Sequence, residues 1–180
     1  SKHMEANESE TVKNLRACEL ILQKVIKKHD GRLFNSGGDS FFIEFPSAVE
    51  AVECAVAFQK DIKKRNSSDI ITVPLEFRIG ISMGDVIKEK ENLLGDGVNI
   101  AARLEALAQT SGITISKNIY DLVKSKTSHQ YNDLGIQKVK KNEFHAYDIL
   151  LDPSQKRKLK TQKSNKPILA IAASFLVIAV

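Results

Sequence analysis

Apolar side chains spaced three and four residues apart predict two amphipathic helices in the first third of the chain. The first has helix-start signals at residues 7–11 and is expected to end near His29-Asp30-Gly31. Its apolar positions are Val12, Leu15, Cys18, Leu22, Val25 and Ile26. The second is expected to begin at Pro46-Ser47 and to fade over residues 63–66, with apolar positions at Val49, Val52, Val56 and Phe58. Such steps place side chains on one helix face, so both helices should pack on a core.

Short apolar runs bounded by Gly and Asp predict strands around these helices. Residues 32–35 and 41–45 flank Gly37-Gly38-Asp39, which is typical of a hairpin turn. Residues 73–82 predict another strand, residues 84–85 a turn, and residues 86–90 the antiparallel partner of that strand.

The second half of the chain alternates the same two kinds of element. A third helix is predicted over residues 98–108, a strand over residues 112–116, and a fourth helix from an N-cap at Ser116 to about residue 124. Residues 130–139 and 144–150 predict a final strand pair. Helices packed on one mainly antiparallel sheet place the chain in the α+β class.

Composition changes this picture little, but it excludes several kinds of protein. With 180 residues, 42% hydrophobic and 27% charged, the chain has the composition of one globular domain, not of a disordered, collagen-like or disulfide-scaffold protein. The only two cysteines, Cys18 and Cys54, fall within the helical patterns and lack metal-ligand spacing. We therefore expect two thiols in the core.

The basic charge belongs to one segment near the end of the chain. The net charge is +5, and residues 153–166 contain six basic residues and no acidic one, so the remaining residues carry −1. A basic domain face for nucleic acid is therefore not predicted, and no motif supports such a partner.

Residues 167–180 carry no charge. They predict the start of a transmembrane helix, with a buried C-terminal helix as the alternative. Basic residues beside a membrane helix favour the cytoplasmic side. We thus expect residues 1–152 to form a cytoplasmic domain at the inner membrane, residues 153–166 a juxtamembrane linker, and residues 167–180 the anchor.

Two small constellations could carry chemistry. Asp39 at a glycine-rich turn suits a Mg²⁺ or Mn²⁺ shared with nucleotide phosphates, or it is an ordinary turn residue. Asn99 and Arg103 lie four residues apart on the third helix and so share a face. An amide and a guanidinium side by side can hold a sugar oxygen and a phosphate oxygen, or they are part of a solvated face.

Three segments occur together in an order that is far more specific. Residues 31–45 (GRLFNSGGDSFFIEF), 78–86 (RIGISMGDV) and 95–105 (GDGVNIAARLE) resemble, in sequence and order, the catalytic domain of bacterial class III adenylate/guanylate cyclases. The resemblance covers residues 1 to about 150. It implies a palm-type, ferredoxin-like α+β fold.

The resemblance also implies a reaction and the residues that serve it. Class III cyclases join the ribose 3′-oxygen of a nucleoside triphosphate to its α-phosphate and release pyrophosphate, with two Mg²⁺ or Mn²⁺ ions. Asp39 matches one metal aspartate, and the other would lie in a strand before Ser1, because residues 1–4 match the stretch that follows that strand. Asn99 matches the residue that orients the ribose, and Arg103 the residue that stabilises the transition state. Lys140 matches the lysine that grips the terminal phosphates, with Lys141 as the alternative.

The expected substrate depends on two further positions. The purine-selecting positions of the family align with Asn35 and Asn92, where the family has lysine and an aspartate or threonine. Asn can both donate to and accept from a purine edge. Neither position has the Glu or Cys of a guanylate cyclase, so we expect ATP over GTP. The family is active as a dimer, so the resemblance implies a homodimer with sites at its interface.

Two other interpretations remain open. One is a non-catalytic cyclase-like module that binds nucleotide or dimerises, which Asn35 and Asn92 favour. The other is a diguanylate cyclase, because residues 37–41 look like that family's turn. Ser40 replaces the acidic residue of that turn, and residues 95–105 have no counterpart there.

Overall fold

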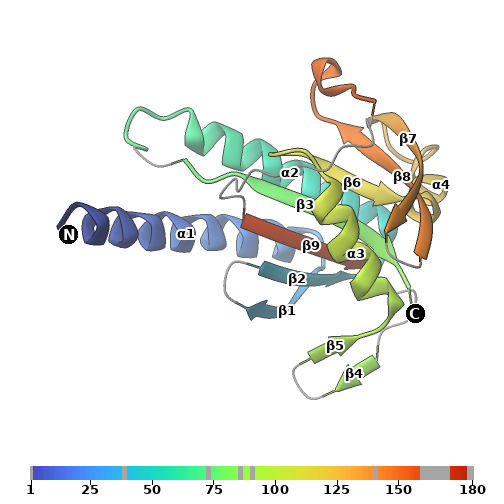
Figure 1. Ribbon diagram of the computed structural model, residues 1–180, viewed down its shortest axis with the longest axis horizontal. Coiled ribbons are helices and arrows are strands. Elements are labelled where there is room, and N and C mark those ends of the chain that lie inside the picture. Colours follow the sequence, from blue (N-terminus) through green and yellow to red (C-terminus); the bar gives the residue numbers. More distant parts are fainter. Residues whose placement is uncertain are drawn as a thin grey trace.

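Seven strands form one mixed sheet in the computed structural model of the chain (Figure 1). The strand order is β1-β2-β9-β3-β6-β8-β7. The structure describes residues 2–37, 40–71, 74–84, 87–89, 92–139, 142–158 and 171–177. Helices and strands share one architecture within this part of the chain, which confirms the predicted α+β class.

The elements follow the predicted order closely. The described helices are α1 (Lys2–Lys28), α2 (Ala48–Asn66), α3 (Asp96–Leu107) and α4 (Lys117–Val123). The strands of the large sheet are β1 (Arg32–Gly37), β2 (Ser40–Phe45), β3 (Phe77–Met83), β6 (Ile113–Ser116), β7 (Gln130–Val139), β8 (Asn142–Leu150) and β9 (Ile171–Val177). A small second sheet contains β4 (Ile87–Glu89) and β5 (Asn92–Leu94), and a 3-10 turn, η1 (Pro153–Gln155), follows β8.

The predicted helices are confirmed, with differences at their starts. α1 begins before the expected residues 7–11, and Val12 is 46% exposed instead of facing the core. Ser47 is the N-cap of α2, and its hydroxyl accepts a hydrogen bond from the Glu50 amide at 3.2 Å. Ser116 is the N-cap residue of α4, but its side chain makes no capping bond.

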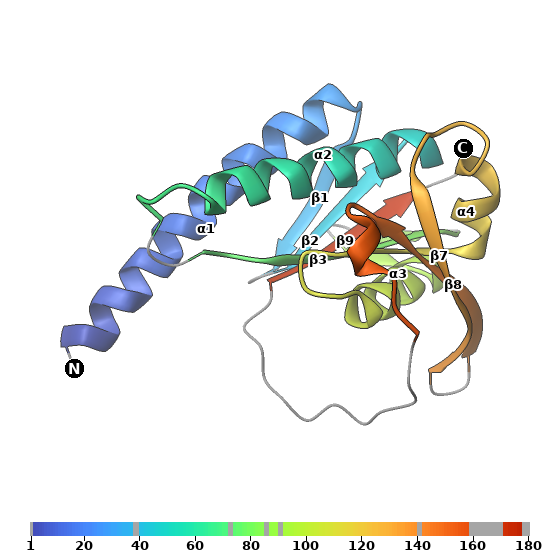
Figure 2. The ribbon, with the colours of Figure 1, turned by 90° about the horizontal axis from the view of Figure 1, so that it is seen from above.

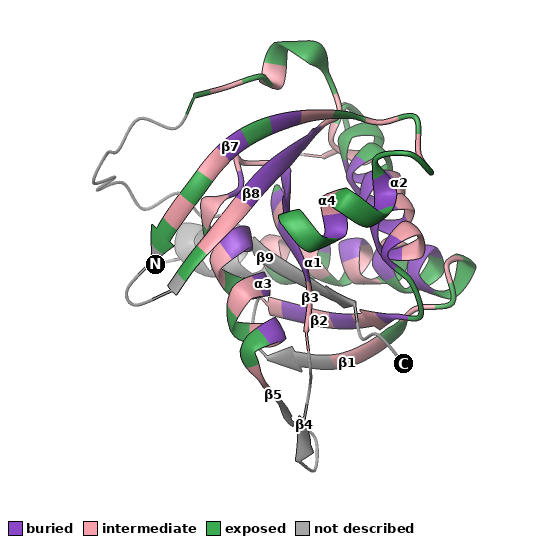
Figure 3. Cartoon of the chain, turned by 90° about the vertical axis from the view of Figure 1, so that its right-hand side faces the viewer, coloured by how far each residue is buried: buried purple, intermediate pink, exposed green. Residues whose placement is uncertain are grey.

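Helices α1, α2 and α4 cover one face of the sheet and form the main core with it (Figure 2). Phe58 of α2 meets Phe77 of β3 edge-to-face, with ring centroids 5.1 Å apart. Cys18 and Cys54 are buried free thiols in this core, as the sequence predicts. Burial raises the pKa of the Cys54 thiol to about 12. The purple segments of α2 and of the central strands mark this core in Figure 3.

Helix α3 lies on the opposite face of the sheet from α1 and α2 (Figure 2). Its Leu104 packs with Leu134 of β7 and Ala146 of β8 in a second, smaller cluster. Strand β3 separates the two clusters because alternate residues of a strand point to opposite faces. Phe77, Ile79 and Ile81 of β3 belong to the main core.

The predicted partner of residues 86–90 is wrong. Within the described residues, β4 and β5 form an antiparallel pair in which Ile87 lies opposite Leu94 and Glu89 lies opposite Asn92. Strand β3 pairs instead with β6 and β9. The sequence signal for a turn at residues 84–85 therefore does not mark a hairpin onto β3. Both edges of β3 are therefore paired with strands longer than β4, namely β6 and β9.

The expectation of a mainly antiparallel sheet is also wrong, because the sheet is mixed. β9 lies between β2 and β3 and is parallel to both, and β3 is parallel to β6. Segment 171–177 is thus a strand, where the sequence predicts the start of a transmembrane helix within residues 167–180. An apolar run with β-branched residues satisfies its backbone equally well between two strands that offer free ladder groups. Among the described residues, no helix has the length and apolar character needed to cross a membrane. The cytoplasmic location of residues 1–152 stays a prediction.

Candidate functional site

Helix α3 presents the two catalytic candidates that the sequence indicates. Asn99 lies in its first turns and is exposed, and Arg103 follows one turn later and is half-buried. Nη1 of Arg103 is buried and has no hydrogen-bond partner among the described residues. A buried guanidinium nitrogen normally has an acceptor, because an unpaired polar group is costly. Arg103 therefore keeps a donor available for an anionic group that the described residues do not supply.

The start of α3 depends on glycine. Gly95 is the N-cap residue and has φ of 149°, a backbone conformation that residues other than glycine rarely adopt. The backbone N–H of Asn99 donates to the backbone carbonyl of Gly95 at 3.3 Å, which closes the first turn. Asp96 places an acidic side chain in that turn, where the helix dipole favours it. Gly95 thus has a local structural role at the start of the helix that carries Asn99.

Three residues of β3 that face α3 hold the helix in place. A Cβ atom at Gly80 would lie 2.1 Å from the Ala101 carbonyl oxygen, so the helix backbone rests directly on the strand. The buried Ser82 hydroxyl donates to the Gly97 carbonyl at 2.6 Å. Arg78 Nε lies 2.8 Å from Glu105 Oε1.

These contacts fix α3 along its length, and none of them was predicted from the sequence. The sequence does contain a sign of these contacts, because polar or small residues alternate with apolar residues along β3. Arg78, Gly80 and Ser82 interleave with the apolar residues of β3 and so share the face that bears α3. A polar, small and polar residue on one face of a central strand indicates that a helix approaches closely there.

The two candidate purine contacts lie on strands that touch. Asn35 is on β1, where it pairs with Phe42 after a register shift between Leu33 and Asn35. Asn92 begins β5 and pairs with Glu89. β1 contacts β5, so the backbone positions of Asn35 and Asn92 come from neighbouring elements.

The phosphate and metal candidates lie outside the described residues. Asp39 belongs to residues 38–39, between β1 and β2, and Lys140 and Lys141 link β7 to β8. Val139 pairs with Asn142 on either side of that link. Within the described residues, no three His, Cys, Asp or Glu side chains lie close enough together to hold a metal ion. The described donor set alone therefore does not fit a metal centre, and Asp39, the metal ligand that the sequence predicts, lies outside the described residues.

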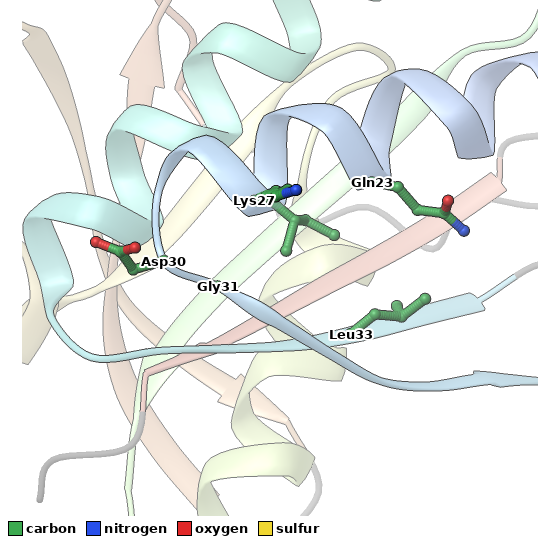
Figure 4. A pocket seen from close by; sticks show the side chains of 6 residues that line it. Gln23, Lys27, Asp30, Gly31 and Leu33 are labelled. Carbon is green, nitrogen blue, oxygen red and sulfur yellow. The ribbon is translucent and has the colours of Figure 1, made fainter.

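A pocket of about 360 Å³ lies elsewhere, between the end of α1 and β1 (Figure 4). Its described lining residues are Gln23, Ile26, Lys27, Asp30, Gly31 and Leu33. None of them is a residue that the sequence indicates for the site. The pocket has one acidic, one basic, one neutral polar and two apolar side chains, a mixture that does not define a particular ligand.

The family of the chain follows from sequence comparisons. Residues 2–151 match the family model described as the adenylate and guanylate cyclase catalytic domain. A protein of Rhizobium meliloti (strain 1021) named "Putative adenylate cyclase 3" is 39% identical over 141 residues, which cover 78% of this chain and 24% of that protein. Adenylate cyclase 1 of the same organism is 28% identical over 137 residues, covering 67% of this chain and 21% of that protein. The chain thus spans about a quarter of the length of these relatives.

Solved structures agree with the family match. An adenylate/guanylate cyclase/hydrolase from Silicibacter pomeroyi is 30% identical, with a TM-score of 0.70 over 83% of this chain and 89% of that one. The adenylyl cyclase CyaB from P. aeruginosa is 25% identical, with a TM-score of 0.62 over 81% of this chain and 83% of that one. The palm-type α+β fold expected from the sequence is therefore confirmed, and the chain belongs to the class III adenylate and guanylate cyclase catalytic domain family.

Proposed function

We propose that this domain converts ATP into 3′,5′-cyclic AMP and pyrophosphate. The ribose 3′-oxygen forms a bond to the α-phosphorus, the bond from that phosphorus to the β-phosphate bridging oxygen breaks, and the 3′-hydroxyl proton passes to solvent. The observation that carries the proposal is the pair on α3. Arg103 keeps a buried, unpaired Nη1 among the described residues, one helical turn from the exposed Asn99.

The pair suits the needs of this reaction. Negative charge builds up around the α-phosphate as the new bond forms, and a fixed guanidinium beside it needs no rearrangement to stabilise that charge. Asn99 can hold a ribose oxygen so that the 3′-hydroxyl faces the phosphorus, which is the positional part of catalysis. The contacts of Arg78, Gly80 and Ser82 with α3 support this role, because they restrict where the two side chains can be.

ATP is the proposed nucleotide, with GTP as the competitor to test. The contact of β1 with β5 supports a shared role for Asn35 and Asn92 at the purine. Two amides can satisfy adenine, and neither supplies the carboxylate that would favour guanine. Curated relatives of this chain carry the name adenylate cyclase, which agrees with this choice.

We also propose that Asp39 is a ligand of two Mg²⁺ or Mn²⁺ ions and that Lys140, or Lys141, contacts the terminal phosphates. Carboxylate and phosphate oxygens are the ligands that these ions prefer. When bound, the ions would neutralise phosphate charge and favour ionisation of the 3′-hydroxyl. Asp39 sits between β1 and β2, whereas Asn99 and Arg103 sit on α3.

The proposed site is completed by a second copy of the chain. In a twofold homodimer each subunit offers the same surface, so Asp39 of one subunit can serve the α3 pair of the other and the reverse. The unpaired Nη1 of Arg103 supports such an arrangement, because its acceptor must come from outside the described residues of its own chain. The Asp39→Ala protein and the Arg103→Ala protein should each lack activity alone, and mixing them should restore it. Some of the mixed dimers then contain one intact site, with Asp39 from one subunit and Arg103 from the other.

The second candidate is a binding module without turnover. It is favoured by Asn35 and Asn92, which replace the family's purine-selecting residues. The two functions differ in product, not in binding. The full-length natural protein should therefore be incubated with ATP or GTP and with Mg²⁺ or Mn²⁺, and cyclic AMP, cyclic GMP and pyrophosphate should be measured. Cyclic AMP above cyclic GMP supports the proposal. Nucleotide binding with neither product contradicts it and favours the module.

A further inference from the structure

Arg157 is docked into the domain, although the sequence places it in a basic linker. Its side chain is 19% exposed, and that of Asp148, on β8, is 9% exposed. Arg157 Nε donates to Asp148 Oδ2 at 2.7 Å, and Nη2 donates to Asp148 Oδ1 at 3.1 Å. This two-pronged geometry is the strong, directional form of an arginine–carboxylate pair. Arg157 is therefore held in one orientation and does not belong to a free basic cluster.

The same guanidinium also reaches the end of the catalytic helix. Nη2 of Arg157 donates to the carbonyl oxygen of Leu107 at 2.8 Å, and Leu107 is the last residue of α3. The last carbonyls of a helix have no partner within it, and a cation there also suits the helix dipole. One side chain thus joins the end of α3 to strand β8.

The surrounding residues hold both partners in position. Thr114 on β6 donates to Asp148 Oδ1 at 2.7 Å, which fixes the carboxylate from its other side. The buried Asn132 on β7 donates to the Arg157 carbonyl oxygen at 2.7 Å. The chain reaches this place through η1, where Asp152 and Gln155 form a capping box. Three strands and a capped turn therefore contribute to a single contact with α3.

The distance to the proposed chemistry is short. Leu107 follows Arg103 by four residues, which is about 6 Å along the helix axis. Ser82 ties the start of α3 to β3, and Gly80 and Arg78 contact the helix further along, at Ala101 and Glu105. Arg157 adds a tie at the last residue, Leu107. A helix held at both ends cannot tilt or unwind without breaking one of these contacts.

We propose that Arg157 is a positioning residue for Arg103, which rests on the function proposed above. Arg157 clamps the last turn of α3 to Asp148 and so keeps the Arg103 guanidinium where the phosphate charge develops. It touches no substrate. The domain boundary then lies beyond residue 157, because the site needs a residue from the segment after η1.

The test compares three variants. Arg157→Lys keeps the charge beside Asp148 but, with a single nitrogen, cannot make the two-pronged pair and reach Leu107 together. Arg157→Met with Asp148→Asn removes the contact to Leu107 without leaving a buried charge unpaired, so this variant keeps the test valid if Arg157→Lys folds poorly. Lys158→Ala is the control, because Lys158 is an exposed neighbour.

Hydrogen exchange gives a readout that does not depend on activity. Amides of residues 104–108 should exchange about 10-fold faster in the first two variants, while amides in α2 keep the wild-type rate. Lys158→Ala should match wild type throughout. If both clamp variants fold and the end of α3 exchanges as in wild type, the proposal is wrong. If wild type makes no cyclic nucleotide, the proposed function fails, and the exchange result still decides whether the clamp exists.

Turnover separates positioning from a general structural role. At a temperature where all variants are folded, Arg157→Lys should lower kcat about 10-fold with little change in KM, because Arg103 acts on the transition state. In an Arg103→Ala background the same change should have little further effect. Equal 10-fold losses in both backgrounds would show that Arg157 does not act through Arg103.

Discussion

The buried hydroxyl of Ser82 donates a 2.6 Å hydrogen bond to the carbonyl oxygen of Gly97, joining the middle of the sheet to the first turn of α3. Ser82 is fully buried, so water cannot replace it as the donor. The position of Asn99, two residues after Gly97, therefore depends on a side chain of β3.

Ser82→Ala should lower the free energy of unfolding by about 1 kcal/mol, the usual effect of losing one buried hydrogen bond. Urea unfolding measures this change. Ser68→Ala is a matched control, because Ser68 is exposed and should leave the midpoint unchanged. Equal midpoints for the two variants would mean that the contact with Gly97 does not stabilise the fold.

Gly80→Ala should displace α3. The new Cβ atom would lie 2.1 Å from the Ala101 carbonyl oxygen and 2.3 Å from the Glu105 amide nitrogen, and both are backbone atoms that cannot rotate away. Overpacking of this kind costs about 1–3 kcal/mol, and the shift should also lower kcat, because Arg103 moves with the helix.

A second glycine provides the control for this variant. Gly135 has φ of 71° and open space around its Cβ position, so Gly135→Ala should cost about 1 kcal/mol through backbone strain alone. Turnover per folded molecule should then stay at the wild-type level. Wild-type stability and turnover in Gly80→Ala would show that α3 does not rest on β3 as described.

Cys54 should make the protein less stable at alkaline pH. Burial raises the pKa of its thiol from 9.0 to about 12 in the folded state, so the unfolded chain loses the proton first. The stabilisation is complete below pH 9 and is lost as the pH rises towards 12.

Urea unfolding at pH 8 and pH 10 tests this effect. Wild type should lose roughly 1 kcal/mol more than Cys54→Ala between these values, since one pH unit corresponds to about 1.4 kcal/mol for one group. The pKa of the Cys18 thiol is also raised, mainly by burial. Cys18→Ala, like Cys54→Ala, should therefore lose less stability than wild type between pH 8 and pH 10. The same pH dependence in Cys54→Ala as in wild type would exclude Cys54 as the cause.

Strand β9 can be tested through its backbone. Ala173 pairs with Phe41 on one side and Ile79 on the other, so both ladders need the N–H groups of this strand. Ala173→Pro should destabilise the protein by about 3 kcal/mol, because proline removes a donor inside a sheet. Ala173→Gly keeps the donor and should cost about 1 kcal/mol or less. Identical urea midpoints for the two variants would contradict the place of β9 in the sheet.

Much of the fold could be predicted because local signals agree with the final structure. Gly37 and Ser40 pair across the predicted hairpin, Ser47 caps α2 as expected, and the thiols of Cys18 and Cys54 are buried. Each of these features depends on residues close together in sequence or on a periodic apolar face.

The features that sequence reasoning missed depend on distant partners. β9 reaches β2 and β3 from the far end of the chain, and no local pattern tells an apolar strand from the start of an apolar helix. Arg157 looked like part of a basic linker because its partner Asp148 lies on β8, across a folded turn. Within the site, Asn99 and Arg103 could be indicated because the resemblance of residues 95–105 to the family adds to their spacing, whereas the pairing of Glu105 with Arg78 depends on a distant strand.

The central claim is that α3 carries a catalytic pair, and one kinetic comparison tests it most directly. Initial rates of cyclic AMP formation from ATP and Mn²⁺ should be measured for wild type, Arg103→Ala and Arg16→Ala, with Arg16 as an exposed arginine on α1. Arg103→Ala should lower kcat about 100-fold, with a KM close to wild type and unchanged unfolding, because a transition-state charge contact is lost. Arg16→Ala should keep the wild-type rate. Equal rates for Arg103→Ala and wild type would contradict the account.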